Sequence, residues 1–176
     1  MKMIGTFLAV CFFGIFSSGI YNQHFTALSG NEVYLSQYEG KKLLLVNMAS
    51  ESEYAAVQIP QLETLYQLYK DSLVVIGFFS NDYSHEPRSN TELKLLLQDT
   101  YHTTFPASQI MGVRDSTGHT HLLYQWLQMQ SQNGNSNIKV KNDFQKYLIS
   151  ADGNIIGIFS ARINPMDSTI RNAILQ

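Results

Sequence analysis

Cysteine is nearly absent from this chain, which contains one cysteine among 176 residues. That residue, Cys11, lies within an apolar N-terminal stretch, and the sequence after it contains no thiol. The chain beyond this stretch can therefore form no disulfide. It also has no thiolate for redox chemistry or for binding a soft metal.

A strong excess of charge of either sign is also lacking. The 12 lysines and arginines nearly balance the 14 aspartates and glutamates, so the formal net charge is −2. There is no block of like charges and no internal repeat. The sequence therefore predicts neither a nucleic acid partner nor binding to an anionic membrane surface.

The N-terminal residues 1–19 have the pattern of a secretory signal peptide. A positive charge at Lys2 precedes an apolar segment, and small residues end at Gly19. The apolar segment is short for a membrane span, so we predict cleavage after Gly19 and a secreted or periplasmic protein that does not contact the membrane. Two alternatives stay open, namely an uncleaved N-terminal membrane anchor and a lipid attached to Cys11.

Residues 20–176 are predicted to form one domain that begins with two buried strands. The apolar runs at residues 43–48 and 73–79 lack polar alternation, which is typical of strands buried on both faces of a parallel sheet. Apolar spacing between the two runs predicts a helix over about residues 54–70. Pro60 lies awkwardly in that stretch and is an alternative start for the helix.

The remaining pattern completes an alternation of strands and helices. We predict a short strand at 32–35, a helix from Ser89 or Asn90 to about 100, a weaker strand at 110–113, a helix at 122–129, a loop at 131–137, hairpin strands at 144–149 and 155–159, and a last helix from Asp167. This order predicts an α/β protein with a central mixed sheet flanked by helices, which is a thioredoxin-like fold.

The polar turn Glu51-Ser52-Glu53 directly follows the first buried strand. In open α/β sheets, binding and catalysis gather at the carboxyl ends of the strands. The turn is therefore the first place to look for a functional site.

Several segments in the same order and spacing resemble the glutathione peroxidase family over about residues 21–175. They are residues 44–50, 62–66, 73–78, 86–90, 104–106, 121–127 and 143–149. The resemblance implies reduction of hydroperoxides by a cysteine or selenocysteine that follows the first strand. It also implies a glutamine, a tryptophan and an asparagine that polarise that centre.

The sequence departs from the family pattern at each of these positions. Ser52 stands at the nucleophile position, Asp82 at the glutamine position, and Asn142 and Asp143 at the tryptophan and asparagine positions. These four are the family-equivalent site residues, and we assign none of them a confident catalytic role. A serine oxygen forms no stable oxidised state comparable to a sulfenic acid, so we predict that thiol peroxidase activity is lost.

We expect the vacated cleft to bind an unidentified small molecule or protein, with Tyr54, Tyr83 and Phe79 along its walls. Two alternatives are a retained hydroperoxide reductase that acts in oxidative stress and a hydrolase that uses Ser52 with His85.

No cofactor and no metal are predicted. The side chains of Glu51, Glu53, Asp82 and Asp143 are a weaker candidate for a calcium site, and we interpret them as a solvated acidic rim. His119 and His121 alternate as two metal ligands on a strand do, but the resemblance places them at the start of a helix, so we interpret them as surface residues.

Overall fold

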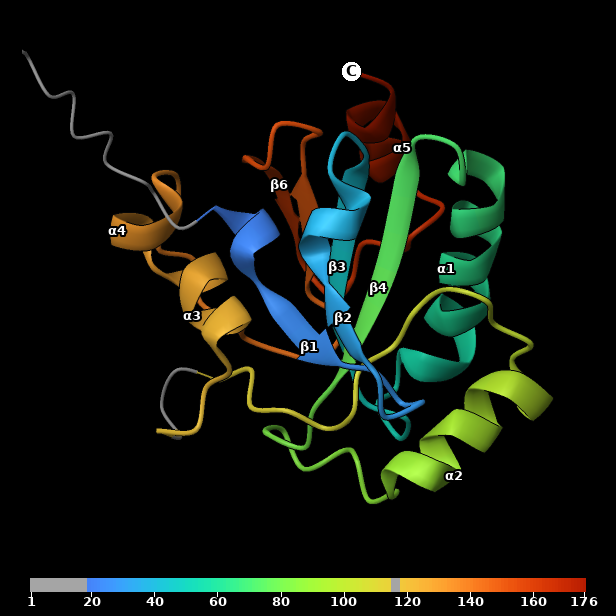
Figure 1. Cartoon of the computed structure of the whole chain (residues 1–176). Helices are drawn as coiled ribbons and strands as arrows, with labels where there is room; N and C mark the ends of the chain where they lie inside the picture. Colours follow the sequence, from blue (N-terminus) through green and yellow to red (C-terminus); the bar gives the residue numbers. More distant parts are fainter. Residues whose placement is uncertain (1–18, 115–117) are drawn as a thin grey trace, which may run out of the picture.

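The computed structural model describes residues 19–114 and 118–176 (Figure 1). Residues 1–18 of the predicted signal peptide, which include Cys11, lie outside the described residues. Within the described part of the chain, no helix is both long enough and apolar enough to span a membrane.

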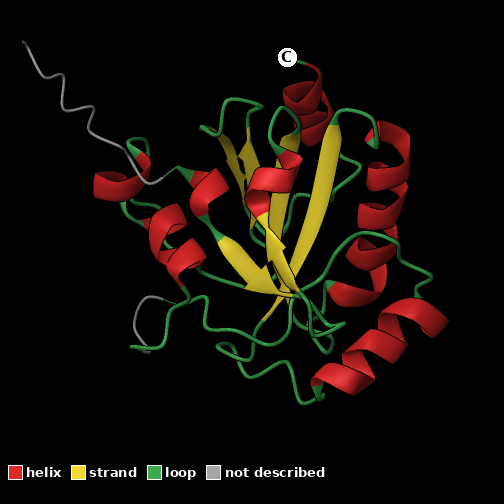
Figure 2. Ribbon diagram, in the orientation of Figure 1, coloured by secondary structure: helices red, strands yellow, loops and turns green. Residues whose placement is uncertain are grey.

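A four-stranded mixed sheet forms the centre of the protein (Figure 2). The strand order is β4-β3-β5-β6. The strands are β3 (Lys42–Met48), β4 (Leu73–Phe79), β5 (Lys146–Ile149) and β6 (Ile155–Phe159). β3 and β4 are parallel, whereas β5 is antiparallel to both of its neighbours, β3 and β6. The predicted central mixed sheet is therefore confirmed.

The two central strands are buried on both faces, as their apolar runs predicted. Alternate side chains enter two separate cores, because successive residues of a strand point to opposite faces. Leu44 and Val46 pack with α1 (Ala55–Tyr69) and α5 (Ser168–Leu175). Leu43 and Leu45 pack with α3 (Leu122–Gln128) on the other face. Helices thus cover both faces of the sheet, as Figure 1 shows.

The remaining elements are short. They are the helix α2 (Asn90–Leu95), which continues as a wider turn at Leu96–Thr100, the helix α4 (Gln130–Asn133), the hairpin of β1 (His24–Thr26) and β2 (Glu32–Tyr34), and single 3-10 turns at Ile20–Asn22 and Leu35–Tyr38. Asp167 caps α5 by accepting a hydrogen bond from the Thr169 amide, so the predicted start of the last helix is confirmed.

Pro60 lies inside α1, so the alternative in which it starts the helix is wrong. A proline removes the hydrogen bond to the carbonyl four residues earlier, which here belongs to Ala56. Both Pro60 and Ala56 are exposed, so water can solvate the carbonyl that the proline leaves unbonded. This location makes the interior proline tolerable.

The predicted strand at residues 110–113 is also wrong. Only an isolated bridge between Gly112 and Thr120 forms there. The chain folds back so closely here that a side chain at Gly112 would overlap the carbonyl of His119. The segment therefore pairs with residues near His119 and does not join the sheet.

The predicted loop at 131–137 is partly helical, because α4 occupies its beginning. The Asn133 side chain stabilises the end of this helix by accepting hydrogen bonds from the amides of Asn135 and Ser136. The predicted strand at 144–149 begins two residues later than expected. Phe144 has a φ of 61°, a left-handed conformation that does not fit a regular strand.

Candidate functional site

A pocket of about 500 Å³ lies at the carboxyl ends of β3 and β4. Its walls come from residues 51–54, Tyr83, His85, Asn142, Asp143 and Arg162. These segments are far apart in sequence but meet here because β3, β4 and β6 run in one direction and β5 runs in the opposite direction. The predicted location of the site is therefore the place where the structure has a pocket.

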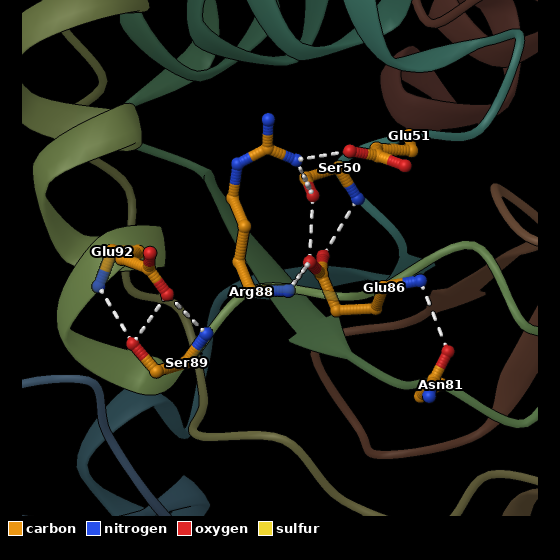
Figure 3. Close-up of polar contacts among 7 residues, drawn as sticks. All are labelled: Ser50, Glu51, Asn81, Glu86, Arg88, Ser89 and Glu92. Carbon is orange, nitrogen blue, oxygen red and sulfur yellow. Dashed lines mark hydrogen bonds and ion pairs between the residues drawn. The ribbon is translucent and has the colours of Figure 1, made fainter.

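The turn after β3 is held by a buried carboxylate. Glu86 is 2% exposed, and it accepts hydrogen bonds from the Ser50 amide at 2.7 Å and from the Ser50 hydroxyl at 2.6 Å (Figure 3). The Glu86 amide donates in turn to the Asn81 side chain at 3.0 Å. The backbone joins the same two loops, since the Glu51 amide donates to the His85 carbonyl at 3.0 Å. The loops after β3 and β4 therefore form one connected unit.

Arg88 extends this connection toward the surface. Its guanidinium donates to the Ser50 hydroxyl at 2.6 Å and lies 3.4 Å from the Glu51 carboxylate (Figure 3). The Glu51 side chain is 56% exposed, so this ion pair contributes little to stability. It nevertheless offsets part of the negative charge that the sequence places beside Ser52.

The segment before β5 is anchored to β3 by a buried asparagine. The Asn47 side chain donates to the Asn142 carbonyl at 2.9 Å, and the Asn47 carbonyl accepts from the Phe144 amide at 2.7 Å. Asn47 is fully buried. These bonds fix Asp143, which lies between the two bonded residues, at the edge of the pocket.

Asp143 and His85 form a close pair in the pocket. His85 Nδ1 lies 2.6 Å from Asp143 Oδ2, and the exposed fractions of the two side chains are 53% and 2%. Burial raises the pKa of Asp143, and the hydrogen bond to His85 opposes that effect. The second carboxylate oxygen, Oδ1, is buried without a hydrogen-bond partner among the described residues. The pocket therefore contains an acceptor with spare capacity.

Ser52 lies on the pocket wall and is 8% exposed. Its backbone takes part in a tight turn, because its amide donates to the Ala49 carbonyl and its carbonyl accepts from the Ala55 amide. No hydrogen bond of its hydroxyl forms within the described residues. A ligand in the pocket would therefore displace no protein hydrogen bond of this hydroxyl.

Among the other family-equivalent residues, Asn142 and Asp143 share the pocket with Ser52, but Asp82 does not line it. Asp82 Oδ2 accepts hydrogen bonds from the amides of Val113 and Arg114, each at 2.7 Å. The carboxylate thus stabilises the irregular segment around Val113 and Arg114. A residue-by-residue comparison with the family does not predict this role.

The predicted aromatic wall is correct for two of its three residues. Tyr54 and Tyr83 line the pocket. The Tyr83 hydroxyl donates to the Val140 carbonyl at 2.7 Å, and burial raises its pKa to about 12. Phe79 is fully buried in the core, so the prediction that it lines the pocket is wrong. As the last residue of β4, it points into the core below the pocket.

The structure does not assemble a metal site from the candidates. Within residues 19–114 and 118–176, no group of three or more His, Cys, Asp or Glu side chains is placed to hold a metal ion. His121 is the N-cap of α3, where Nδ1 accepts from the Leu123 amide, and burial lowers its pKa. His119 is exposed, so the two histidines have separate surroundings.

Sequence reasoning missed Arg162 and the structural role of Glu86. Arg162 follows β6, whose carboxyl end lies at the same sheet edge as that of β3, so correct strand order would have identified it. Glu86 belongs to one of the segments that carry the family resemblance. Its position next to Pro87 within such a segment was the sequence feature that could have indicated a structural role.

The fold and the site together define a thioredoxin-fold protein whose pocket lies at the carboxyl edge of the sheet. A thiol:disulfide interchange protein of the thioredoxin family from Chlorobium tepidum TLS has a similar structure, with a TM-score of 0.62. The two sequences are 14% identical, and the match covers 86% of this chain and 92% of that one.

Sequence comparison identifies the family more closely. The family model described as glutathione peroxidase matches residues 20–128, and the chain belongs to that family. A glutathione peroxidase of Lactococcus lactis subsp. cremoris is 34% identical over 140 residues, which cover 78% of this chain and 87% of the relative. The crystal structure of Trgpx in apo form matches with a TM-score of 0.66 at 31% identity and covers 90% of this chain and 97% of that one.

Proposed function

We propose that this protein is a glutathione peroxidase relative that does not reduce hydroperoxides through a thiol and that binds a small molecule or protein in the pocket beside Ser52. The observation that carries the proposal is that a pocket is lined by a serine at the position where the resemblance places the family's nucleophile. We also propose that the protein is exported, on the basis of the signal-peptide pattern in residues 1–19.

The chemistry of oxygen supports the loss of peroxidase activity. A peroxidatic thiolate attacks the peroxide, becomes a sulfenic acid and is then reduced by another thiol. A serine hydroxyl has no comparable oxidised state. A lower pKa at Ser52 would therefore not restore the redox step, and no cysteine follows Cys11 to act in its place.

The form of the pocket supports a binding role. A volume of about 500 Å³ falls in the range of small-molecule sites. The Tyr54 and Tyr83 rings provide partly apolar walls, and Asp143 offers a buried oxygen that lacks a partner. A ligand that donates a hydrogen bond to this oxygen would satisfy it, so we expect such a donor in the ligand.

Hydroperoxide consumption with glutathione or thioredoxin as the reductant tests the proposal. We expect the wild-type protein to match a heat-denatured control. The variant Ser52→Cys should gain measurable peroxide reduction, because it places a thiol in the intact pocket. The matched control is Ser131→Cys, which adds a thiol at an exposed position of α4 and should gain much less.

Sustained turnover by the wild-type protein would show that it is a peroxidase and would overturn the proposal. Failure of Ser52→Cys to exceed Ser131→Cys would show that the substitutions at Asn142 and Asp143 have also removed the surroundings that a thiolate needs.

A further inference from the structure

Three side chains that are typical of a nucleophilic hydrolase line the same pocket. Ser52 comes from the turn after β3, His85 from the loop after β4, and Asp143 from the segment before β5. The sequence suggested only a pair of Ser52 with His85. The third member, Asp143, is recognisable only in the folded protein, where it contacts His85.

The contact between His85 and Asp143 has the geometry of an orienting hydrogen bond. The 2.6 Å separation joins Asp143 Oδ2 to His85 Nδ1. A buried carboxylate that accepts from Nδ1–H leaves the other ring nitrogen, Nε2, as an acceptor. No hydrogen bond of Nε2 forms within the described residues, and the His85 side chain is 53% exposed. Nε2 is thus free to take a proton from a nucleophile.

Backbone contacts hold the nucleophile candidate close to this histidine. The Glu51 amide donates to the His85 carbonyl at 3.0 Å, so the residue directly before Ser52 is bonded to His85 itself. Glu86, the residue directly after His85, holds Ser50 from the other side. No hydrogen bond joins Ser52 to His85 in the described structure. In enzymes without bound substrate, the distance between nucleophile and base is often longer than a hydrogen bond, and it shortens when substrate binds.

The start of α1 provides donors for a developing negative charge. The amides of Glu53 and Tyr54 follow Ser52 directly and donate no hydrogen bond within the described part of the chain. They lie at the positive end of a helix of 15 residues. Hydrolases commonly use the amide of the residue after the nucleophile to stabilise the oxyanion of a tetrahedral intermediate.

We propose that Ser52, His85 and Asp143 form an acyl-transfer site that hydrolyses small carboxylic esters. Ser52 Oγ bonds to the ester carbonyl carbon as its proton passes to His85 Nε2, and the carbonyl electron pair moves to the oxygen. Collapse of this intermediate breaks the bond to the leaving alkoxide, which takes the proton from His85. Water then attacks the acyl-serine by the same route and releases the carboxylic acid. Asp143 is a positioning residue, since it acts through His85.

The charges around the pocket restrict the substrate class. Glu51, Glu53 and Asp143 outnumber the single Arg162 on its walls. An ester with an anionic acyl group would be repelled, so neutral or cationic small esters are the expected class. The same carboxylates also lie near the oxyanion that develops in both acylation and deacylation, so we expect slow turnover. With an ester that has a good leaving group, acylation is faster than deacylation and the acyl-serine accumulates.

The experiment uses the chain with p-nitrophenyl acetate as the probe. We expect release of p-nitrophenol together with one acetyl group on the protein, located at Ser52 by peptide mass spectrometry. Ser52→Ala should abolish this label. His85→Gln should lower the acylation rate constant by about 100-fold. The controls Ser131→Ala and His119→Gln, both at exposed positions, should acylate at the wild-type rate.

Asp143→Asn separates orientation from folding. We expect the acylation rate constant to fall while the concentration of ester for half-maximal rate stays constant, an effect that a merely structural defect would not produce. Ser52→Cys, which preserves the shape of the turn, should form a thioester much faster than the exposed thiol of Ser131→Cys does, and this comparison covers the case in which Ser52→Ala is unstable.

An acetyl label on lysine or tyrosine in place of Ser52, or an unchanged rate in His85→Gln, would overturn the proposal. These outcomes are independent of the peroxide assay. The absence of peroxidase activity and the presence of ester hydrolysis can therefore be judged separately.

Discussion

Two buried charged residues, Lys146 and Glu86, differ in the number of hydrogen bonds that hold them. Lys146 is fully buried in β5, where its ammonium donates to the Phe144 carbonyl at 2.7 Å. Glu86 is almost as buried but is bonded from several sides. We therefore expect replacement of Lys146 to raise the free energy of unfolding near neutral pH and replacement of Glu86 to lower it.

Lys146→Met should change the pH dependence of stability. Burial lowers the pKa of Lys146 to about 7 from its ordinary 10.5, so the unfolded chain binds a proton that the folded protein does not across that interval. The free energy of unfolding contributed by Lys146 therefore rises with pH over this range. We expect the variant to be more stable than the wild type near neutral pH, with a difference that narrows toward pH of about 9.5.

Urea unfolding at several pH values within this range measures the effect, with Lys94→Met as the control at an exposed position. The tyrosines whose pKa is raised are the same in wild type and variant, so their contribution cancels in the difference between the two proteins. A difference between wild type and Lys146→Met that does not vary with pH would contradict the assigned cause.

Glu86→Gln should weaken the turn that holds Ser52. The substitution keeps the size of the side chain but replaces one acceptor oxygen with a donor, so at least one hydrogen bond from Ser50 or Arg88 is lost. We expect a loss of about 1–3 kcal/mol in the free energy of unfolding. Chemical denaturation measures it, and the exposed Glu39→Gln should remain within about 0.5 kcal/mol of the wild type.

At the scale of elements, the ends of helices are built from short local signals. Ser89 forms a capping box with Glu92, in which each side chain accepts from the backbone of the other residue (Figure 3). Asp167 caps α5 with one hydrogen bond, which its side chain accepts from the Thr169 amide. α1 has no side-chain cap at its N-cap residue, Tyr54. The amides of Glu53 and Tyr54 therefore have no acceptor among the described residues.

Ser89→Ala should destabilise α2 because it removes the capping hydroxyl. We expect a loss of about 1 kcal/mol in the free energy of unfolding. Thermal denaturation followed by circular dichroism measures the change, and Ser131→Ala at an exposed helix position is the matched control. Equal midpoints for the two variants would argue against the capping box as a source of stability.

At the scale of the whole molecule, one pocket collects residues from four separate parts of the chain. The parallel pair β3 and β4, the antiparallel β5 and the returning β6 bring these parts to one edge of the sheet. The protein retains this arrangement with no cysteine after residue 11. Packing of the two cores, not a disulfide, stabilises the described domain.

Export should leave a chain without any thiol. We expect mass spectrometry of the secreted protein to find an N-terminus at Ile20, and thiol titration under denaturing conditions to find no reactive group. Its thermal midpoint should then be the same with and without a reductant. An intact mass that includes residues 1–19, or a lipid on Cys11, would contradict cleavage at this site.

Much of the fold was predictable because its strongest signals are local. The apolar runs that became β3 and β4, the cap at Asp167 and the family resemblance all lie in contiguous segments. The errors occurred where contacts between distant residues dominate. Residues 110–113 look like a strand, but the amides of Val113 and Arg114 donate to the Asp82 carboxylate instead. Phe144 adopts a left-handed conformation, and its amide donates to the Asn47 carbonyl.

For the site, the sequence identified Ser52, Asn142 and Asp143 by their positions within the family pattern, and the structure brings them to one pocket. It did not show that Asp82 bonds to a different loop or that Asp143 contacts His85. Both facts depend on side-chain directions at a sheet edge, which a linear pattern does not contain.

The sequence by itself determined the α/β fold, the family and the absence of a thiol after Cys11, because these follow from composition and from patterns within short segments. Only the tertiary structure decided which polar groups face one another. The His85–Asp143 contact arises because strands distant in sequence end at the same edge of the sheet, which brings their loops together. The same packing leaves the amides after Ser52 without an acceptor among the described residues.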